Sequence, residues 1–281
     1  GNAMSATKRL IALLLLSCLS IPSAEAQETR ATASYRHFKE FLDAVPTVDT
    51  HDHLRPFDQI PGFAETPSGR GMTLHGIWRN SYYAWFNKLT PYADGADFED
   101  WWKSAQSDFD NARATSFYRY MLPAFRDLYG VDFDAITGEQ ARELDRRIFE
   151  NYKDPRWVSH VVTERANIEL MFNDPYWNRY GFTTSYPFEV LVFNVTPLVR
   201  GFHASEFTSD SDSPYVFAKT HGLPVDSLDD YLKVLDAMFL AAKDHGAVCL
   251  KTTLASQRTL RFENVPREKA EPAIGKRGAA L

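Results

Sequence analysis

Two histidines, His51 and His53, stand at the end of a β-branched, apolar run that begins at Val45. Side chains two apart on a strand leave from the same face, so both imidazoles would point to one side. Two imidazoles aimed at one point suit Zn²⁺ or another divalent metal, because metal–nitrogen bonds of about 2.0–2.1 Å need pre-aimed ligands. Asp49 lies on the same face and could accept a ring N–H that fixes the tautomer. The competing interpretation is a solvated turn, since a bare His-x-His is a weak signal by itself.

A lysine, Lys251, ends another apolar run, at residues 247–250. An isolated buried ammonium is costly, so this lysine must find a partner or lose its charge. From its position alone, it is expected to form a structural salt bridge near the strand end. Cys249, inside the run, is expected to be a buried small hydrophobe.

The elements that would position these residues follow from the hydrophobic periodicity. We expect a lead-in helix over residues 27–44 and then a buried first strand that ends at the histidines. Glycines and prolines predict loop over 55–72, and no strand is expected between Leu54 and about residue 165. Helices are expected at residues 74–89, 98–109, 116–129, 138–152 and 227–243, and strands at 167–172, 189–195 and 247–251. The strand–helix alternation after residue 166 predicts parallel βαβ units that are buried on both faces.

Polar residues follow two of the expected strands. Asn173 and Asp174 follow the strand at 167–172, and Asn194, Arg200 and His203 lie at or beyond the end of the next one. The last three could face a site, but side chains of these types after a strand more often bond to loop backbone. The region between residues 74 and 129 is rich in large aromatic rings, which indicates a helical core, or alternatively a lid whose rings touch substrate.

The segment Val48–Leu54 resembles the first strand of the amidohydrolase superfamily of metal-dependent (β/α)₈ barrels, in particular the amidohydrolase-related branch that includes uronate isomerases. The resemblance implies an α/β fold, a partial TIM (β/α)₈ barrel with a helical insertion at about residues 55–165, after strand 1. It implies that His51, His53 and Lys251 hold one or two divalent ions, Lys251 being carboxylated in many members. It also implies that Arg258 binds a substrate carboxylate, although the tyrosine that usually precedes this arginine in the family is absent.

The chain is short for the complete family fold. A full (β/α)₈ barrel takes roughly 250 residues, and the insertion leaves no room after Lys251 for strands five to eight. The family places further histidine ligands and its catalytic aspartate there, so no catalytic residue can be assigned. We therefore expect a fragment or a prematurely ended reading frame, with little or no activity by itself.

Residues 1–26 are expected to contain a cloning remnant and a targeting signal. Gly1–Ala3 has the appearance of a cloning remnant, and a secretory signal follows, with basic residues 8 and 9, an apolar run at 10–16 and an Ala-x-Ala site that ends at Ala26. The run is shorter than the ~20 residues that span a bilayer, and no transmembrane segment is expected. This predicts export to the periplasm or medium, or alternatively a lipoprotein anchored through Cys18.

The composition narrows the function classes. The net charge is −6 and no basic run occurs, which argues against a nucleic-acid partner and leaves a small-molecule substrate. The leading hypothesis is a metal-dependent hydrolase in which metal-activated water attacks an amide, ester or related bond. The alternatives are a uronate-isomerase-like or decarboxylase-like enzyme with one metal, and an exported binding protein whose Trp101 and Trp102 stack on sugars. The oligomeric state is left open.

Overall fold

The computed structural model describes residues 29–276, so the expected cloning remnant, the signal peptide and Cys18 lie outside the described residues. The chain divides after Pro46 into two compact units, which are considered separately. The first contains the 3-10 turn η1 (Thr29–Ala31) and helix α2 (Ala33–Ala44). The hydroxyl of Thr32 accepts from the backbone of Tyr35 and caps α2. The expected lead-in helix is confirmed over this part.

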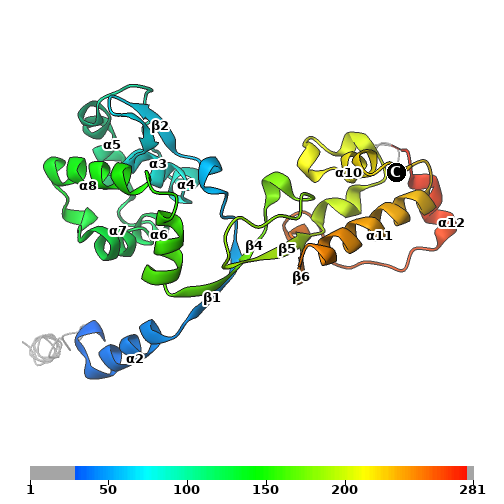
Figure 1. Cartoon of the computed structure of the whole chain (residues 1–281), viewed down its shortest axis with the longest axis horizontal. Coiled ribbons are helices and arrows are strands. Elements are labelled where there is room, and N and C mark those ends of the chain that lie inside the picture. Colours follow the sequence, from blue (N-terminus) through cyan, green and yellow to red (C-terminus); the bar gives the residue numbers. More distant parts are fainter. Residues whose placement is uncertain (1–28, 277–281) are drawn as a thin grey trace, which may run out of the picture. The chain divides into compact units, whose positions relative to one another are not determined.

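The second unit contains a curled parallel sheet, and its strands are β1 (Thr47–Asp52), β4 (Ile168–Asn173), β5 (Glu189–Asn194) and β6 (Cys249–Lys251), side by side in that order (Figure 1). Each neighbouring pair is parallel. The four expected strands and their parallel arrangement are thereby confirmed. With its helices, the chain is a mixed α/β protein whose sheet has the form of half a barrel.

Strand β1 carries an irregularity close to its end. Asp49 pairs with Met171 and Asp52 pairs with Asn173, so β1 advances by one residue more than β4 between these pairs. An extra residue of this kind is a β-bulge, which locally bends a strand and re-aims its side chains. The bulge lies in the part of β1 that includes His51.

The expected burial of the strands is correct only in the middle of the sheet. On β5, Leu191 and Phe193 are 2% and 1% exposed. On the outer strands, Val48 of β1 is 43% exposed and Leu250 of β6 is 59% exposed, and Cys249 is exposed rather than buried. The prediction of a buried first strand was wrong, as was that for Cys249, because β1 and β6 are edge strands that each pair with only one neighbour in the described chain.

A β-hairpin occupies part of the segment that was expected to be loop. Strands β2 (Phe63–Thr66) and β3 (Gly69–Met72) pair antiparallel across a two-residue turn. Gly69 has a φ of 101°, which favours glycine, and a Cβ at Gly71 would lie 2.2 Å from the ring of Phe149. The glycines that suggested a loop therefore serve a tight turn and a close packing contact.

Helices and a short π-helical stretch follow the hairpin and precede β4 (Figure 1). They are α3 (Leu74–Arg79), α4 (Tyr83–Phe86), α5 (Phe98–Ala112), α6 (Ser116–Arg119), α7 (Leu122–Tyr129), α8 (Gly138–Asn151), α9 (Trp157–Ser159) and the π-helical η4 (His160–Arg165). The expected helices 74–89 and 116–129 are each broken into two. The capping box of α8 is present, with Thr137 and Gln140 bonding each other's backbone.

This helical region has an aromatic core around Trp78, which is 0% exposed. Its ring lies 4.8 Å from Tyr83 and 5.1 Å from Phe133, centroid to centroid. The interpretation as a packed core is confirmed for these rings. Trp101 and Trp102 are 3% and 6% exposed, so they are part of the same core and do not form the sugar-stacking surface that was suggested for them.

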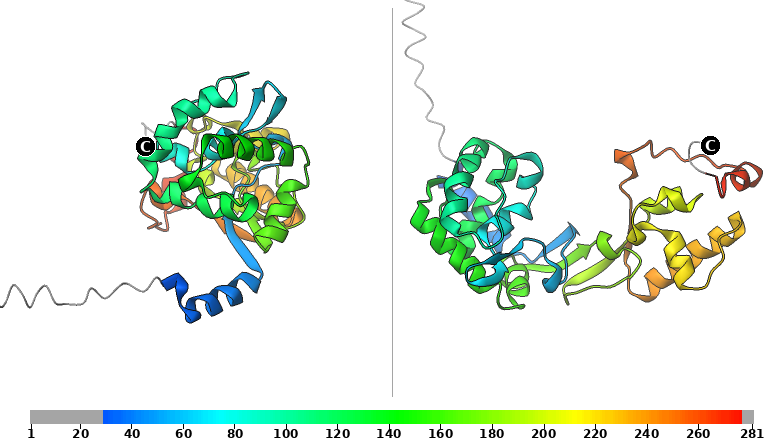
Figure 2. Two further views of the ribbon diagram at one scale, coloured as in Figure 1. Left: turned by 90° about the vertical axis from the view of Figure 1, so that its left-hand side faces the viewer. Right: turned by 90° about the horizontal axis from the view of Figure 1, so that it is seen from above.

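Two helices cover the β5 face that carries Leu191 and Phe193. They are α10 (Pro214–Thr220) and α11 (Leu228–Asp244), which pack against each other (Figures 1 and 2). The Ser227 side chain caps α11. A short helix, α12 (Arg267–Ala270), comes after β6. Between residues 29 and 276, no helix combines the length and the apolar character that a bilayer crossing requires.

Candidate metal centre

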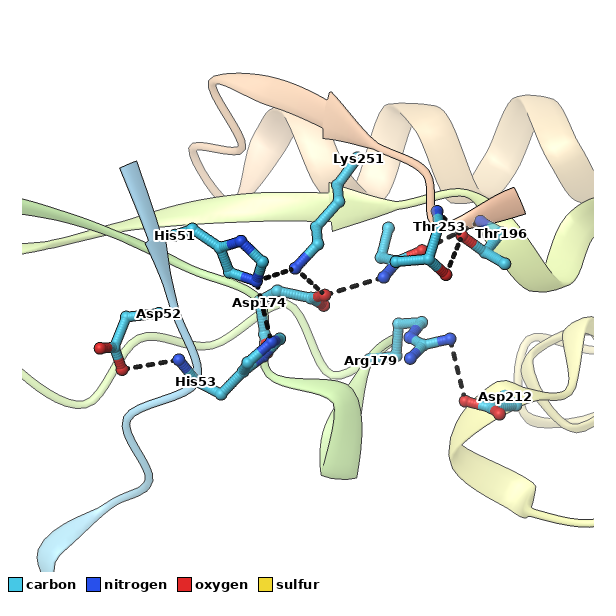
Figure 3. A network of polar contacts seen from close by, with 10 residues as sticks. His51, Asp52, His53, Asp174, Arg179, Thr196, Asp212, Lys251 and Thr253 are labelled. Atoms are coloured by element: carbon cyan, nitrogen blue, oxygen red, sulfur yellow. Dashed lines mark hydrogen bonds and ion pairs between the residues drawn. The ribbon is translucent and has the colours of Figure 1, made fainter. Parts of the chain in front are cut away.

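The two imidazoles converge at the end of β1, as the spacing predicted. His51 lies on β1 and His53 in the loop that follows, and their Nε2 atoms are 3.3 Å apart (Figure 3). Two nitrogens bound to one zinc ion at about 2.05 Å and at a tetrahedral angle would also lie about 3.3 Å apart. The distance between the two Nε2 atoms therefore equals that between two ligand nitrogens on a common ion.

The tautomer of His53 follows from its other nitrogen. Nδ1 lies 2.7 Å from the backbone oxygen of Asp174, and because a carbonyl oxygen only accepts, Nδ1 must donate. In the neutral ring, Nε2 then presents a free lone pair towards His51. A ring N–H donated to a backbone carbonyl is the usual orienting contact of a metal-binding histidine. Asp49 does not have the expected orienting role, since its Oδ1 accepts from the backbone N–H of His51 at 3.0 Å.

Lys251 and Asp174 complete the cluster. The Lys251 Nζ lies 2.9 Å from His51 Nε2 and 3.1 Å from Asp174 Oδ2 (Figure 3). The ammonium can only donate, so Nε2 of His51 also presents a lone pair. The side chains of Lys251 and Asp174 are 18% and 3% exposed, and the carboxylate offsets the cost of placing the ammonium there. One ring nitrogen and one carboxylate oxygen thus flank the Lys251 ammonium, and Nε2 of His53 lies beside that same ring nitrogen.

The Asp174 carboxylate has an unused oxygen. Asn194 donates from Nδ2 to Asp174 Oδ2 at 2.8 Å. The other oxygen, Oδ1, is buried and has no hydrogen-bond partner among the described residues. An unsatisfied buried acceptor costs about 1–3 kcal/mol, and a cation beside it would remove that cost. This donor set fits a divalent metal.

Groups of three or more His, Cys, Asp or Glu side chains arranged to hold a metal do not occur in the described part of the chain. A full coordination shell at the imidazole pair would therefore also draw on Lys251, water or substrate. Zinc accepts nitrogen and oxygen donors of these kinds.

Electrostatics keep His51 in the form that binds metals. Its pKa is lowered below the ordinary value, first by burial and then by the charge of Lys251 and by His53. The ring is therefore neutral near pH 7. Asp52 accepts from the backbone N–H of His53 at 2.6 Å, and burial raises the pKa of its carboxyl.

The loop after His53 is held by hydrogen bonds from two other segments. Asn173 donates from Nδ2 to the backbone oxygen of Leu54 at 2.9 Å and to Glu189 Oε1 at 2.8 Å. The Tyr186 hydroxyl donates to the backbone oxygen of Arg55 at 3.2 Å. Burial raises the pKa of Glu189, which also accepts from backbone N–H groups. His53 is thus set on a fixed rather than a free loop.

A pocket of about 330 Å³ opens beside the cluster. Its lining combines site residues with apolar residues of the sheet, namely Thr50, His51, Phe172, Asp174, Val192, Cys249, Leu250, Lys251 and Thr252. It has the mixed polar and apolar lining that is typical of small-molecule sites.

Arg258 is not brought to the cluster. Its guanidinium lies 4.9 Å from the ring centroid of Phe262 and donates to the backbone oxygen of Thr259, and no contact of the cluster in the described residues involves it. His203 likewise bonds locally, to Ser205. Asn194, in contrast, reaches the site through Asp174.

Sequence reasoning gave Asp174 no role, although its position directly after a predicted parallel strand was the available signal. The carboxyl ends of parallel strands meet at one edge of a sheet, so a carboxylate there is a candidate for a site. The contact itself joins His53 to a residue 121 positions further along the chain.

A comparison with models of known protein families and a comparison with curated proteins find no match to this chain.

Proposed function

We propose that the chain carries the metal centre of a metal-dependent hydrolase of the amidohydrolase type, built on part of a (β/α)₈ barrel. The observation that carries the proposal is the 3.3 Å approach of the two Nε2 atoms beside Lys251 and Asp174. His51, His53 and Lys251 would hold the metal, and Asp174 supplies a carboxylate beside them. The bound metal would supply an activated water and a Lewis acid.

The protein's own residues perform the supporting tasks. The Asp174 backbone carbonyl keeps the Nδ1 proton on His53 and so leaves Nε2 free. Asn194 orients the Asp174 carboxylate. Asn173 fixes the loop that carries His53. Substrate would approach through the pocket beside His51 and Lys251.

One observation favours a second candidate, a single-metal enzyme of the uronate-isomerase or decarboxylase kind. Lys251 forms an ion pair with Asp174 at 3.1 Å. A lysine that keeps its ammonium cannot be a ligand, because it has no lone pair. The histidines would then hold one ion, and the ratio of bound metal to protein separates the two candidates.

Zinc titration by calorimetry tests the proposal. We expect saturable zinc binding to the purified chain, at one or two ions per chain, and a loss of affinity of at least about a hundredfold in His51→Ala, because one of few ligands is removed. His203→Ala is the matched control, since His203 is only partly buried and its side chain bonds within its own loop. Equal zinc binding by the wild type and His51→Ala would refute the proposal.

A further inference from the structure

We propose that Arg55, Tyr176 and Trp177 form an oxyanion subsite beside the candidate metal centre, which binds a carboxylate or phosphate group of the substrate. The inference rests on the proposed function, since it names a group that the substrate of that centre would carry. It assigns to Arg55 a role like the one that the family resemblance implied for Arg258.

Arg55 is held by aromatic rings rather than by an acid. Its guanidinium carbon lies 4.8 Å from the ring centroid of Trp177 and 5.5 Å from that of Tyr176. Its Nη2 lies 3.4 Å from the Tyr176 hydroxyl. Among residues 29–276, no Asp or Glu oxygen forms an ion pair with it, whereas Arg156 and Arg267 each have a carboxylate within 3 Å.

Most N–H donors of the guanidinium are available. The group carries five N–H donors in one plane, and among the described residues the Arg55 side chain donates only to the Tyr176 hydroxyl. Such donors match the two oxygens of a carboxylate or a phosphate in a paired geometry. A half-buried arginine that lies against two aromatic rings, with no acidic partner among the described residues, is therefore prepared to bind an oxyanion.

The subsite and the metal centre are built from the same two segments. One segment carries His53 and Arg55, two residues apart. The other carries Asp174 and then, after Pro175, the rings of Tyr176 and Trp177. The ring of His53 meets that of Tyr176 edge to face, with centroids 5.3 Å apart, so a group on Arg55 would lie next to the histidine pair.

The backbone of Arg55 is also fixed in place before any ligand binds. The backbone oxygens of Leu54 and Arg55 accept from Asn173 and Tyr186 at 2.9 and 3.2 Å, and Pro56 restricts the backbone of Arg55, the residue before it. Little backbone freedom remains to be lost on binding, which favours recognition of even a small anion.

Nuclear magnetic resonance provides the test, with sodium acetate and inorganic phosphate as probes at constant ionic strength. We expect the Arg55 Nε–H and Trp177 indole N–H signals to shift with either probe. The probe that binds more tightly, acetate or phosphate, identifies the class of anion. Arg55→Gln should weaken the binding at least about tenfold, because the charge and the paired donors are lost. Arg55→Lys should be intermediate, since it keeps only the charge.

Arg258→Gln is the matched control, because Arg258 also lies over an aromatic ring but outside the cluster, and it should bind both probes as the wild type does. Unshifted Arg55 and Trp177 signals, or equal binding by Arg55→Gln, would overturn the subsite. Zinc titration and anion titration of the wild type separate the two proposals. A wild type that binds zinc without an anion response refutes the subsite alone, whereas a wild type that responds to anions without binding zinc refutes only the metal centre.

Discussion

The helical region between β3 and β4 and the parallel sheet use their apolar side chains in opposite ways. In the helical region, Trp78 and Tyr83 are completely buried. In the sheet, β5 is covered, while Val248 and Leu250 beside it are 58% and 59% exposed. The polar residues that could do chemistry lie at the ends of these partly covered strands. The difference teaches that the part of the chain with the best packing and the part with the candidate site are separate, so stability and chemistry should respond to different substitutions.

The largest effect that separates the regions is expected from the aromatic core. Trp78→Ala should lower the free energy of unfolding by about 3–5 kcal/mol, because a large buried ring leaves a cavity. Urea unfolding followed by circular dichroism measures it. Trp85→Ala is the matched control, since Trp85 is 74% exposed, and it should change stability by less than about 0.5 kcal/mol. A similar loss of unfolding free energy in Trp78→Ala and Trp85→Ala would contradict the role of the buried aromatic core.

An intermediate effect is expected from a histidine in the helical region. Burial, and then the charge of Arg79, lowers the pKa of His75 to about 4 from 6.5. The unfolded chain then binds more protons between these values, so the contribution of His75 is complete above pH 6.5 and is lost as the pH falls towards 4. The loss should be about 1–3 kcal/mol, since His75 is only half-buried.

Urea midpoints at pH 7 and pH 4.5 measure this effect in the wild type and in His75→Gln, whose decline should be smaller. Asp145 acts in the opposite direction. Burial raises the pKa of its carboxyl to about 6, so its contribution is present below pH 3.8 and is lost as the pH rises through 6. Because Asp145 is present in both the wild type and His75→Gln, its contribution cancels when the two pH profiles are compared. Parallel pH profiles of the wild type and His75→Gln would contradict the assignment.

The smallest effect is expected at the edge of the sheet. Leu250→Ser should change the free energy of unfolding by less than about 0.5 kcal/mol, because this side chain is already mostly in water. Leu191→Ala, on the covered strand, should cost about 2–5 kcal/mol. The same urea measurement tests both. A large loss in Leu250→Ser would show that the two regions depend on their apolar side chains to the same degree.

Much of the secondary structure could be predicted because it follows local rules. The capping box at Thr137 and Gln140 is formed, and the strand ending at Lys251 is present. The β2–β3 hairpin was missed because its glycines also occur in loops, and the packing of Gly71 against Phe149 is a tertiary contact. Local patterns do not contain contacts of that kind.

The site was predictable only in part for a related reason. His51, His53 and Lys251 each end an apolar run, and the structure brings them together. The carboxylate of Asp174 could not be chosen by sequence spacing, since its partners are distant in the chain. Burial of Cys249 was predicted from its apolar neighbours, but burial also requires a covering layer, and that layer is absent over β6 in the described chain.

The extra residue in β1 between Asp49 and Asp52 has a consequence for how this strand tolerates change. Up to Asp49, the side of the sheet to which each side chain points is set by pairing with β4. After the bulge, the alternation of side chains between the two faces is shifted by one residue. Deleting one residue there would let the ladder run on without interruption and would turn the His51 ring towards the opposite side of the sheet. The length of this short stretch, as well as the presence of His51 in it, therefore determines on which side of the sheet that imidazole lies.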